Sequence, residues 1–200
     1  MNFHLPAQTL LDNGPRPKRF TLEEYAQLAE IGFLREDDRI ELIRGELIEM
    51  AAKGMKHTVC CQRLLKALPS QVENATLRCQ DPIQLPSGSE PEPDLVIVRD
   101  RSDDYLDSHP GPSDILLIIE VSDSSIEYDR TVKASLYAEA AIAHYWIFNV
   151  LDTQLEVLEN PFQKANGEFD YRSKQIYSQN QTLSLPAPLT GTIDLSQILP

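Results

Sequence analysis

The sequence predicts an α/β or α+β fold in which a central mixed sheet is flanked by helices. Two apolar runs, Leu95–Val98 and Ile115–Val121, are long enough for buried strands and too short for independent helices. Along the chain, these apolar runs alternate with segments whose sequence patterns predict helices. The helices and strands are therefore expected to pack in layers. Because the 200 residues are 42% hydrophobic, they can bury one sizeable core. We therefore expect a single domain over residues 19–200, preceded by a loose N-terminal arm over residues 1–18.

The domain is expected to begin with a short helix and a hairpin. Thr21 and Glu24 form a capping-box pattern, which predicts a helix that ends near Gly32. Two short apolar-rich runs follow, Arg39–Ile43 and Glu46–Met50, and the two residues between them include a glycine. This pattern is typical of two antiparallel strands joined by a tight turn.

The middle of the chain alternates between helix and strand. Apolar side chains repeat along one helical face between residues 56 and 68, and a strand is expected at about 76–85. The two apolar strands named above come next. Either Ser124 or Ser125 is expected to begin a further helix, which runs to about Ile142.

The last third of the chain predicts a series of strands. Tyr145–Val150 is a strongly apolar run, and a turn leads from it into Leu155–Leu158. Shorter strands are expected at Gln175–Tyr177 and Leu183–Leu185. The order of all these elements implies a mixed sheet with helices beside it.

The composition restricts the compartment. No stretch of the sequence has the length and apolarity of a membrane span, and the N-terminus lacks the basic start and apolar segment of a signal peptide. The three cysteines are an odd number without metal-ligand spacing, and Cys60 and Cys61 are adjacent on an expected helix. Reduced, buried thiols are the interpretation that follows, which favours the cytoplasm and no membrane partner.

One acidic residue stands out because of its surroundings. Glu120 lies at the end of the apolar strand 115–121, where a lone ionised carboxylate needs a cation, a hydrogen-bond network or a raised pKa. Asp94 follows Pro93 and opens the preceding apolar strand. If the two strands are neighbours, the two carboxylates can meet at one end of the sheet. Paired carboxylates with a nearby lysine are what a metal-dependent phosphodiesterase needs.

The helix after this strand supplies a lysine. Asp129, Lys133 and Tyr137 follow one another at four-residue spacing, which places them in one stripe. The alternation of strand residues places the buried glutamate on the same face as Leu116 and Ile118. A lysine on that helix could reach over the strand ends and contact a scissile phosphate.

Each of these residues also has a simpler interpretation. Asp94 can be an ordinary residue at the start of a strand, and Lys133 with Asp129 can be an ordinary pair on a helix surface. Glu41, in the expected hairpin, fits a solvated position equally well. His57 is a lone helical histidine, a kind of residue that is more often structural than catalytic.

The net charge of −13 argues against a nucleic-acid partner, because an acidic surface slows the approach of phosphates. Basic residues are nevertheless unevenly spread along the chain. One group lies between residues 53 and 66, and a second, which includes Arg101, Arg130 and Lys133, flanks the two acids. A local basic cleft on an acidic body and a set of solvated basic faces are both consistent with this distribution.

The motifs, taken in order, resemble the PD-(D/E)XK nuclease superfamily, and most closely its Uma-type branch of uncharacterised restriction endonucleases. The resemblance covers most of the chain, from about residue 21 to residue 150. Each motif alone is weak, and the ordered set is fairly specific. The matching residues are Glu41, His57, Pro93-Asp94, Glu120-Val121-Ser122, Lys133 with Tyr137, and Tyr145-Trp146-Ile147.

The resemblance implies a restriction-endonuclease-like core and a Mg²⁺-dependent (or Mn²⁺-dependent) endonuclease that hydrolyses DNA. It implies that Asp94 and Glu120 are the metal ligands and that Glu41 is an additional acid near the metal. The superfamily places a lysine two residues after its acid, where this chain has Ser122, so Lys133 would be a displaced replacement. The implied catalytic residues are Glu41, Asp94, Glu120 and Lys133, supported in the cleft by His57, Ser122 and Tyr137.

Two other functions fit the same residues. A binding or regulatory protein could keep the fold without effective catalysis, which the net acidity and Ser122 favour. A hydrolase of another, smaller phosphoester would need no DNA. Titration with divalent metals separates both hydrolases from the binding protein, and a panel of substrates separates the two hydrolases from each other. Whether the chain forms a homodimer is left open.

Overall fold

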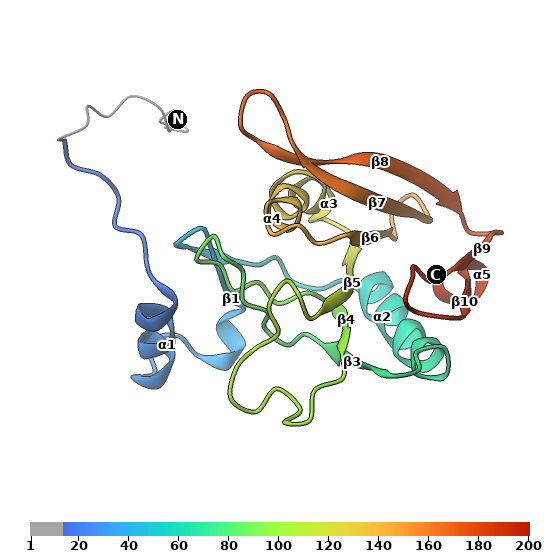
Figure 1. The fold of residues 1–200 in the computed structure, drawn as a ribbon, viewed down its shortest axis with the longest axis horizontal. Helices are drawn as coiled ribbons and strands as arrows, with labels where there is room; N and C mark the ends of the chain where they lie inside the picture. Colours follow the sequence, from blue (N-terminus) through green and yellow to red (C-terminus); the bar gives the residue numbers. More distant parts are fainter. Residues whose placement is uncertain (1–13) are drawn as a thin grey trace.

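The computed structural model describes residues 14–200, and a six-stranded mixed sheet forms its centre (Figure 1). The strands follow the spatial order β3-β4-β5-β6-β7-β8, and only β5 and β6 run parallel among these neighbours. This arrangement confirms the predicted mixed sheet. The bounds of the strands are β3 Ala75–Cys79, β4 Leu95–Arg99, β5 Ile115–Ser122, β6 His144–Asn149, β7 Gln154–Gln163 and β8 Phe169–Ser178.

An N-terminal helix and a hairpin precede the sheet, as expected. Helix α1, Leu22–Glu30, has the full capping box of Thr21 and Glu24. Strands β1, Ile40–Ile43, and β2, Glu46–Glu49, pair in antiparallel register. A short 3-10 helix, Glu36–Asp38, lies between α1 and β1.

The turn of this hairpin explains its glycine. Arg44 and Gly45 both have positive φ, 50° and 80°, as a tight hairpin turn requires. A side chain at residue 45 would also place its Cβ 2.7 Å from Cβ of Arg19. Residues 14–18, which belong to the expected arm, contain no helix or strand, and residues 1–13 of that arm lie outside the described part of the chain. The boundary between arm and domain stays a prediction.

Helices cover both faces of the sheet, and each face has its own apolar core. On one face, α2, Met55–Ala67, packs with the C-terminal α5, Leu195–Ile198 (Figure 1). On the other face lie α3, Ile126–Tyr128, and α4, Ala134–Glu139. A π-helical turn, Asp129–Lys133, joins α3 to α4 without a break. No helix within residues 14–200 has both the length and the apolarity needed to cross a bilayer.

A β-bulge in β5 changes the face of the sheet on which one residue, Leu116, was predicted to lie. Ile97 pairs with Leu117, but Val98 pairs with Ile115, so Leu116 has no partner on β4. Leu116 therefore packs in the core beneath α2, while Ile118 packs in the core beneath α4. The expectation that Leu116 shares a face with Glu120 is wrong for this reason, and the expectation for Ile118 is confirmed.

Several predicted strands have different lengths in the structure. The strand expected at 76–85 ends at Cys79, because Gln80 takes a positive φ of 56° and Pro82 follows. Strands β7 and β8 are longer than expected, since the outer half of their hairpin mixes apolar and polar residues and has one buried side chain, Tyr171. Two C-terminal elements were missed, strand β10, Thr192–Asp194, which pairs with β9, Thr182–Ser184, and helix α5.

An ion pair fixes the π-helical turn against the sheet. Glu156 of β7 is fully buried and accepts hydrogen bonds from Arg130 Nε at 3.1 Å and from Lys174 Nζ at 2.6 Å. Burial alone would raise the pKa of Glu156, but Arg130 and Lys174 outweigh it and lower the pKa to about 2. Arg130 lies on the same turn as Lys133, so this pair helps to position that lysine.

We expect Glu156 to contribute to stability in a pH-dependent way. Because its pKa in the fold lies below the ordinary 4.5, its contribution is complete above pH 4.5 and is lost as the pH falls towards 2. The contribution amounts to at most about 3 kcal/mol. Urea unfolding from pH 6 to pH 3 should show a smaller pH dependence for Glu156→Gln than for the wild type.

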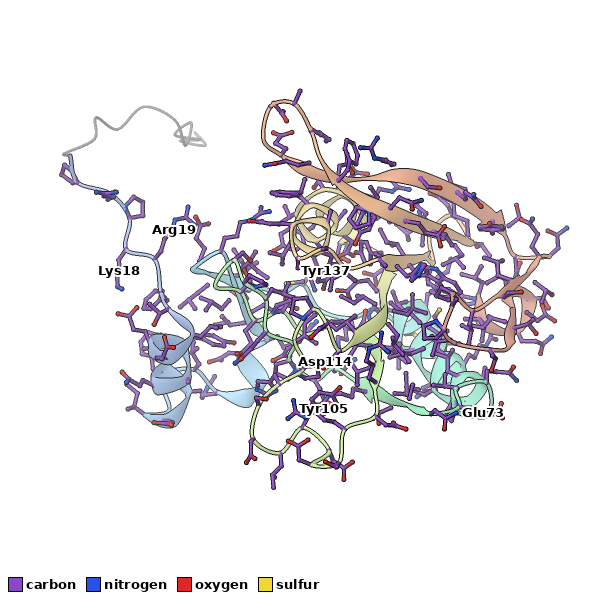
Figure 2. All side chains as sticks on the ribbon, in the orientation of Figure 1. Lys18, Arg19, Glu73, Tyr105, Asp114 and Tyr137 are labelled. Atoms are coloured by element: carbon purple, nitrogen blue, oxygen red, sulfur yellow. The ribbon has the colours of Figure 1, made fainter. Side chains whose placement is uncertain are left out.

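The control for this experiment is Glu73→Gln, a change at an exposed site on the outer edge of the molecule (Figure 2). This variant should keep the wild-type pH dependence. Equal slopes for the wild type and Glu156→Gln would show that the buried ion pair does not hold the carboxylate in its charged form.

Candidate active site

Asp94 and Glu120 lie side by side at one end of the sheet. Strands β4 and β5 pair in a register that places Leu95 opposite Ile119, and so brings the residues just beyond that pair together. The backbone N–H of Asp94 donates to Glu120 Oε2 at 3.2 Å, and the N–H of Val121 donates to Asp94 Oδ2 at 3.0 Å. Both acids are buried, with 7% and 4% of their surface exposed.

Lys133 reaches this pair of acids from the π-helical turn. Its Nζ lies 2.9 Å from Glu120 Oε1 and 3.1 Å from Glu41 Oε1, and only 2% of the residue is exposed. Glu41 comes from the β1 strand of the N-terminal hairpin and is buried as well. The interpretations of Lys133 as a helix-surface residue and of Glu41 as a solvated one are therefore wrong.

Two further side chains of the helix complete the hydrogen bonding. Tyr137 of α4, which is labelled in Figure 2, donates from its hydroxyl to Glu120 Oε1 at 2.8 Å. Asp129 accepts from Ser122 Oγ at 2.5 Å and from Ser125 Oγ at 2.7 Å. Ser122 therefore points toward the helix and holds Asp129.

The charges of the three central groups follow from their surroundings. Burial would lower the pKa of Lys133, but the carboxylates of Glu120 and Glu41 outweigh it and hold the pKa well above its ordinary value. Burial raises the pKa of Glu120 to about 8, although Lys133 opposes the change. Burial would also raise the pKa of Asp94, but His57 and the hydrogen bond from the Val121 N–H outweigh this effect, so the pKa of Asp94 is lowered. The two neighbouring acids thus shift in opposite directions.

Two carboxylate oxygens of the site have little or no hydrogen bonding. Glu41 Oε2 is buried and has no partner among the described residues. Asp94 Oδ1 has two contacts, with Lys53 Nζ and Gln80 Nε2, and both are 3.5 Å long. Carboxylate oxygens of this kind are the ligands that Mg²⁺ and Mn²⁺ prefer. The donor set therefore fits a hard divalent cation.

These groups open into a cavity of about 910 Å³ between the sheet end and the N-terminal segments. Within residues 14–200, seven acidic side chains line it, against four cationic ones. The four cations are Arg35, Arg39, Lys53 and Lys133. Of the arginines expected to flank the acids, Arg101 instead pairs with Asp103, and Arg130 pairs with Glu156. The cavity is therefore more acidic than a basic cleft would be.

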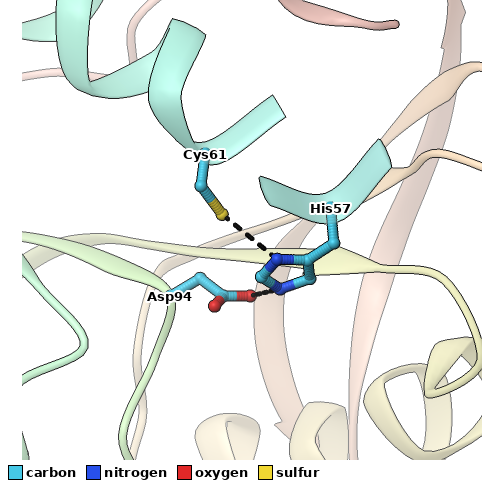
Figure 3. A group of neighbouring side chains, drawn as sticks. All are labelled: His57, Cys61 and Asp94. Carbon is cyan, nitrogen blue, oxygen red and sulfur yellow. Dashed lines mark hydrogen bonds and ion pairs between the residues drawn. The ribbon is translucent and has the colours of Figure 1, made fainter. Parts of the chain in front are cut away.

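His57 lies directly against Asp94. It faces the sheet from α2, and its Nε2 lies 2.9 Å from Asp94 Oδ2 (Figure 3). Its other ring nitrogen, Nδ1, lies 3.6 Å from Cys61 Sγ. His57 and Cys61 lie four residues apart on one helical face, so the helix brings a thiol beside the imidazole, a proximity that the cysteine pattern alone did not indicate. Both Cys60 and Cys61 are free and buried, as expected.

Other residues of the site carry weak signals in the sequence. Lys53 and Gln80 contact Asp94 from loops, and nothing in their local pattern indicates this. Arg35 and Arg39 flank the short 3-10 helix, and they reach the cavity only because the hairpin folds over the sheet end. The position of His57 within its helix is the one signal that could have led to Cys61.

Comparisons with known proteins agree with this architecture. No curated protein matches the chain. A solved structure, described as "a putative nuclease belonging to DUF820" from Anabaena variabilis, is similar with a TM-score of 0.60. The similarity covers 90% of this chain and 97% of the other at 10% sequence identity, so it shows a shared fold. The family Uma2, described as "Putative restriction endonuclease", matches residues 22–196. Since this match covers most of the sequence, the chain belongs to the Uma2 family of restriction-endonuclease-like proteins.

Proposed function

We propose that this protein is a divalent-metal-dependent endonuclease that hydrolyses DNA phosphodiester bonds. The observation that carries the proposal is the meeting of Asp94, Glu120 and Lys133 at the floor of one cavity. Two carboxylates from neighbouring strands and a charged lysine are the groups that such a hydrolysis needs. The membership in the Uma2 family supports the same activity.

Asp94 and Glu120 would hold Mg²⁺ or Mn²⁺, and Glu41 offers a further carboxylate oxygen beside them. When bound, such an ion polarises the phosphate and lowers the pKa of the attacking water. Tyr137 and Lys133 both hydrogen-bond Glu120 Oε1, which fixes the orientation of that carboxylate. His57 fixes Asp94 in the same way.

Lys133 would stabilise the negative charge that develops on the phosphate oxygens. An ammonium group has three N–H donors, and two of them are taken by Glu41 and Glu120. The third remains for a phosphate oxygen in the cavity, which Lys133 lines. Since this charge is preorganised by two buried carboxylates, it costs no rearrangement when the substrate reacts.

The acidity of the cavity favours one alternative, a hydrolase of a smaller phosphoester. A polyanion such as DNA approaches an acidic surface slowly, whereas a small substrate presents fewer charges. Arg35, Arg39 and Lys53 lie at the same cavity and could offset this repulsion locally. Cleavage assays with DNA and with a small phosphoester therefore distinguish the two substrates.

The test is a nuclease assay with the purified chain and supercoiled plasmid DNA. We expect nicked and linear products with Mg²⁺ or Mn²⁺ and none with a chelator. A parallel assay uses bis(p-nitrophenyl) phosphate, and a Glu120→Gln preparation controls for contaminating nucleases. Cleavage of the small ester alone would replace DNA as the substrate. Metal binding without cleavage of either substrate would instead support a binding or regulatory role.

A further inference from the structure

Three side chains with different donor atoms meet beside the cavity, two of them at its wall and one behind it. His57 and Cys61 extend from one face of α2, and Asp94 meets them from the start of β4 (Figure 3). One ring nitrogen, the thiol sulfur and one carboxylate oxygen all lie within 4.8 Å of one another. All three residues are buried, with exposures of 5%, 6% and 7%.

This set of donors differs in chemistry from the carboxylates beside it. A thiolate and an imidazole select borderline or soft ions such as Zn²⁺ and Co²⁺, whereas Mg²⁺ prefers oxygen ligands alone. Bonds of 2.0–2.3 Å to a tetrahedral ion separate the ligand atoms by about 3.3–3.8 Å. The 2.9 Å contact of His57 with Asp94 involves Nε2 and the 3.6 Å contact with Cys61 involves Nδ1, and only one of these nitrogens can bind the ion. With one donor atom taken from each residue, the three lie within 4.8 Å of one another, so side-chain rotations of about 1 Å are needed to close the site.

The order Cys61, His57, Asp94 also resembles the arrangement of a thiol nucleophile with its base. Two observations exclude that interpretation. His57 and Asp94 line the cavity, but Cys61 does not, so its sulfur does not reach a substrate there. Burial also raises the pKa of the Cys61 thiol, whereas a nucleophilic cysteine needs a lowered one.

We propose that His57, Cys61 and Asp94 form a site for a divalent transition ion of the Zn²⁺ class. When it binds, Asp94 is no longer available to the hard-cation site, the Mg²⁺ or Mn²⁺ site that Asp94 would form with Glu120 and Glu41. As the metal–sulfur bond forms, the thiol proton leaves to solvent, and His57 binds as neutral imidazole. The cavity provides the path of entry and the fourth coordination position. The ion-binding step stands by itself, and the regulatory consequence rests on the proposed nuclease function.

One neighbouring cation opposes this binding. Lys53 Nζ lies 3.5 Å from Asp94 Oδ1, but about a third of the lysine side chain is exposed. The side chain can therefore turn outward when an ion binds. Lys53→Met should consequently raise the affinity for the transition ion.

The test is a titration of the purified, chelator-treated chain with Co²⁺, followed by absorption spectroscopy. We expect one equivalent to produce a sulfur-to-cobalt charge-transfer band in the near ultraviolet and tetrahedral bands in the visible range. Added Zn²⁺ should remove both. Cys61→Ser and Cys61→Ala should lose the charge-transfer band and bind at least about 100-fold more weakly, since even outer-shell changes cost 10–100-fold. Circular dichroism checks that both variants are folded.

The matched control is Cys60→Ser, which changes the adjacent buried thiol but leaves the contact with His57 intact. It should keep the full charge-transfer band. Glu120→Gln should keep it as well, because Glu120 belongs to the hard-cation site alone. A wild type without the band, or a folded Cys61 variant that retains it, overturns the proposal.

The regulatory consequence is read separately, as inhibition of Mg²⁺-dependent cleavage by Zn²⁺. Inhibition of the wild type should occur at Zn²⁺ concentrations at least about tenfold below those that inhibit Cys61→Ser. If the protein cleaves no substrate, the cobalt spectrum still decides whether the site exists. If it cleaves and Zn²⁺ inhibits both proteins equally, the site does not control Asp94.

Discussion

Asp94→Asn and Glu120→Gln are each expected to reduce metal-dependent cleavage at least about 10³-fold while changing stability in opposite directions. The loss of cleavage follows because each variant removes one charged oxygen donor from the cation. A bound metal supplies several kcal/mol of transition-state stabilisation, and about 4 kcal/mol corresponds to about 10³-fold in rate. Single-turnover cleavage of plasmid DNA measures this effect.

The stability changes follow from the opposite pKa shifts of the two acids. The fold lowers the pKa of Asp94 through His57 and the Val121 N–H, which outweigh its burial, so it favours the charged form. Asp94→Asn loses these charge-assisted hydrogen bonds, at a cost of about 1–3 kcal/mol. The fold raises the pKa of Glu120 to about 8, mainly through burial, so it favours the neutral form. Glu120→Gln supplies a neutral side chain of the same shape.

The sign of the pH dependence distinguishes the two acids further. A carboxyl group whose pKa rises from 4.5 to about 8 on folding loses stability as the pH increases through that interval. In the presence of a chelator, Glu120→Gln should therefore gain stability relative to the wild type between pH 5 and pH 8. Asp107→Asn, a change at an exposed loop acid, should match the wild type in both assays. Wild-type cleavage by either variant would remove that residue from the set of metal ligands.

Lys133→Met is expected to destabilise the fold by about 3–5 kcal/mol and to lower the cleavage rate by about 10²–10³-fold. The stability loss arises because the buried Glu41 is left without its cation and Glu120 loses a hydrogen-bond donor. The rate loss arises because no charge remains to stabilise the phosphate oxygens. Chemical unfolding and single-turnover cleavage under stabilising conditions measure the two effects.

Two further variants test this explanation. Lys66→Met replaces an exposed lysine on α2 and should change neither quantity. The double variant Glu41→Gln/Lys133→Met should recover part of the stability, since it buries one charge fewer, but none of the activity. If the single variant Lys133→Met cleaves at the wild-type rate, Lys133 serves only to neutralise the buried acids.

The sequence alone predicts the central strands and the meeting of the acids for a common reason. Asp94 and Glu120 adjoin apolar runs that can only be buried strands, so their own burial follows from their neighbours. The four-residue spacing of Lys133 and Tyr137 gives their shared face in the same way. Patterns of this kind are local in the sequence, so they can be interpreted without knowing the tertiary contacts.

The features that were missed depend on contacts between distant segments. The face of the sheet on which Leu116 lies depends on a β-bulge, and a bulge cannot be recognised from the sequence of one strand without its partner. Cys61 meets His57 and Asp94 only because α2 packs against the start of β4, which lies 33 residues further along the chain. The short strand β10 and helix α5 have too few residues to show a period, and they form because they cover an exposed part of the core.

The contact between Lys133 and Glu41 joins residues 92 positions apart. Closing so long a loop costs conformational entropy, and contacts between residues far apart in the sequence slow folding. During synthesis, Glu41 and Asp94 emerge from the ribosome well before their lysine. A nascent chain shorter than 133 residues therefore contains Glu41 and Asp94 without the lysine that pairs with Glu41 in the fold. The complete candidate site is therefore a property of the folded chain, in which the N-terminal hairpin and the helix after β5 both contribute to it.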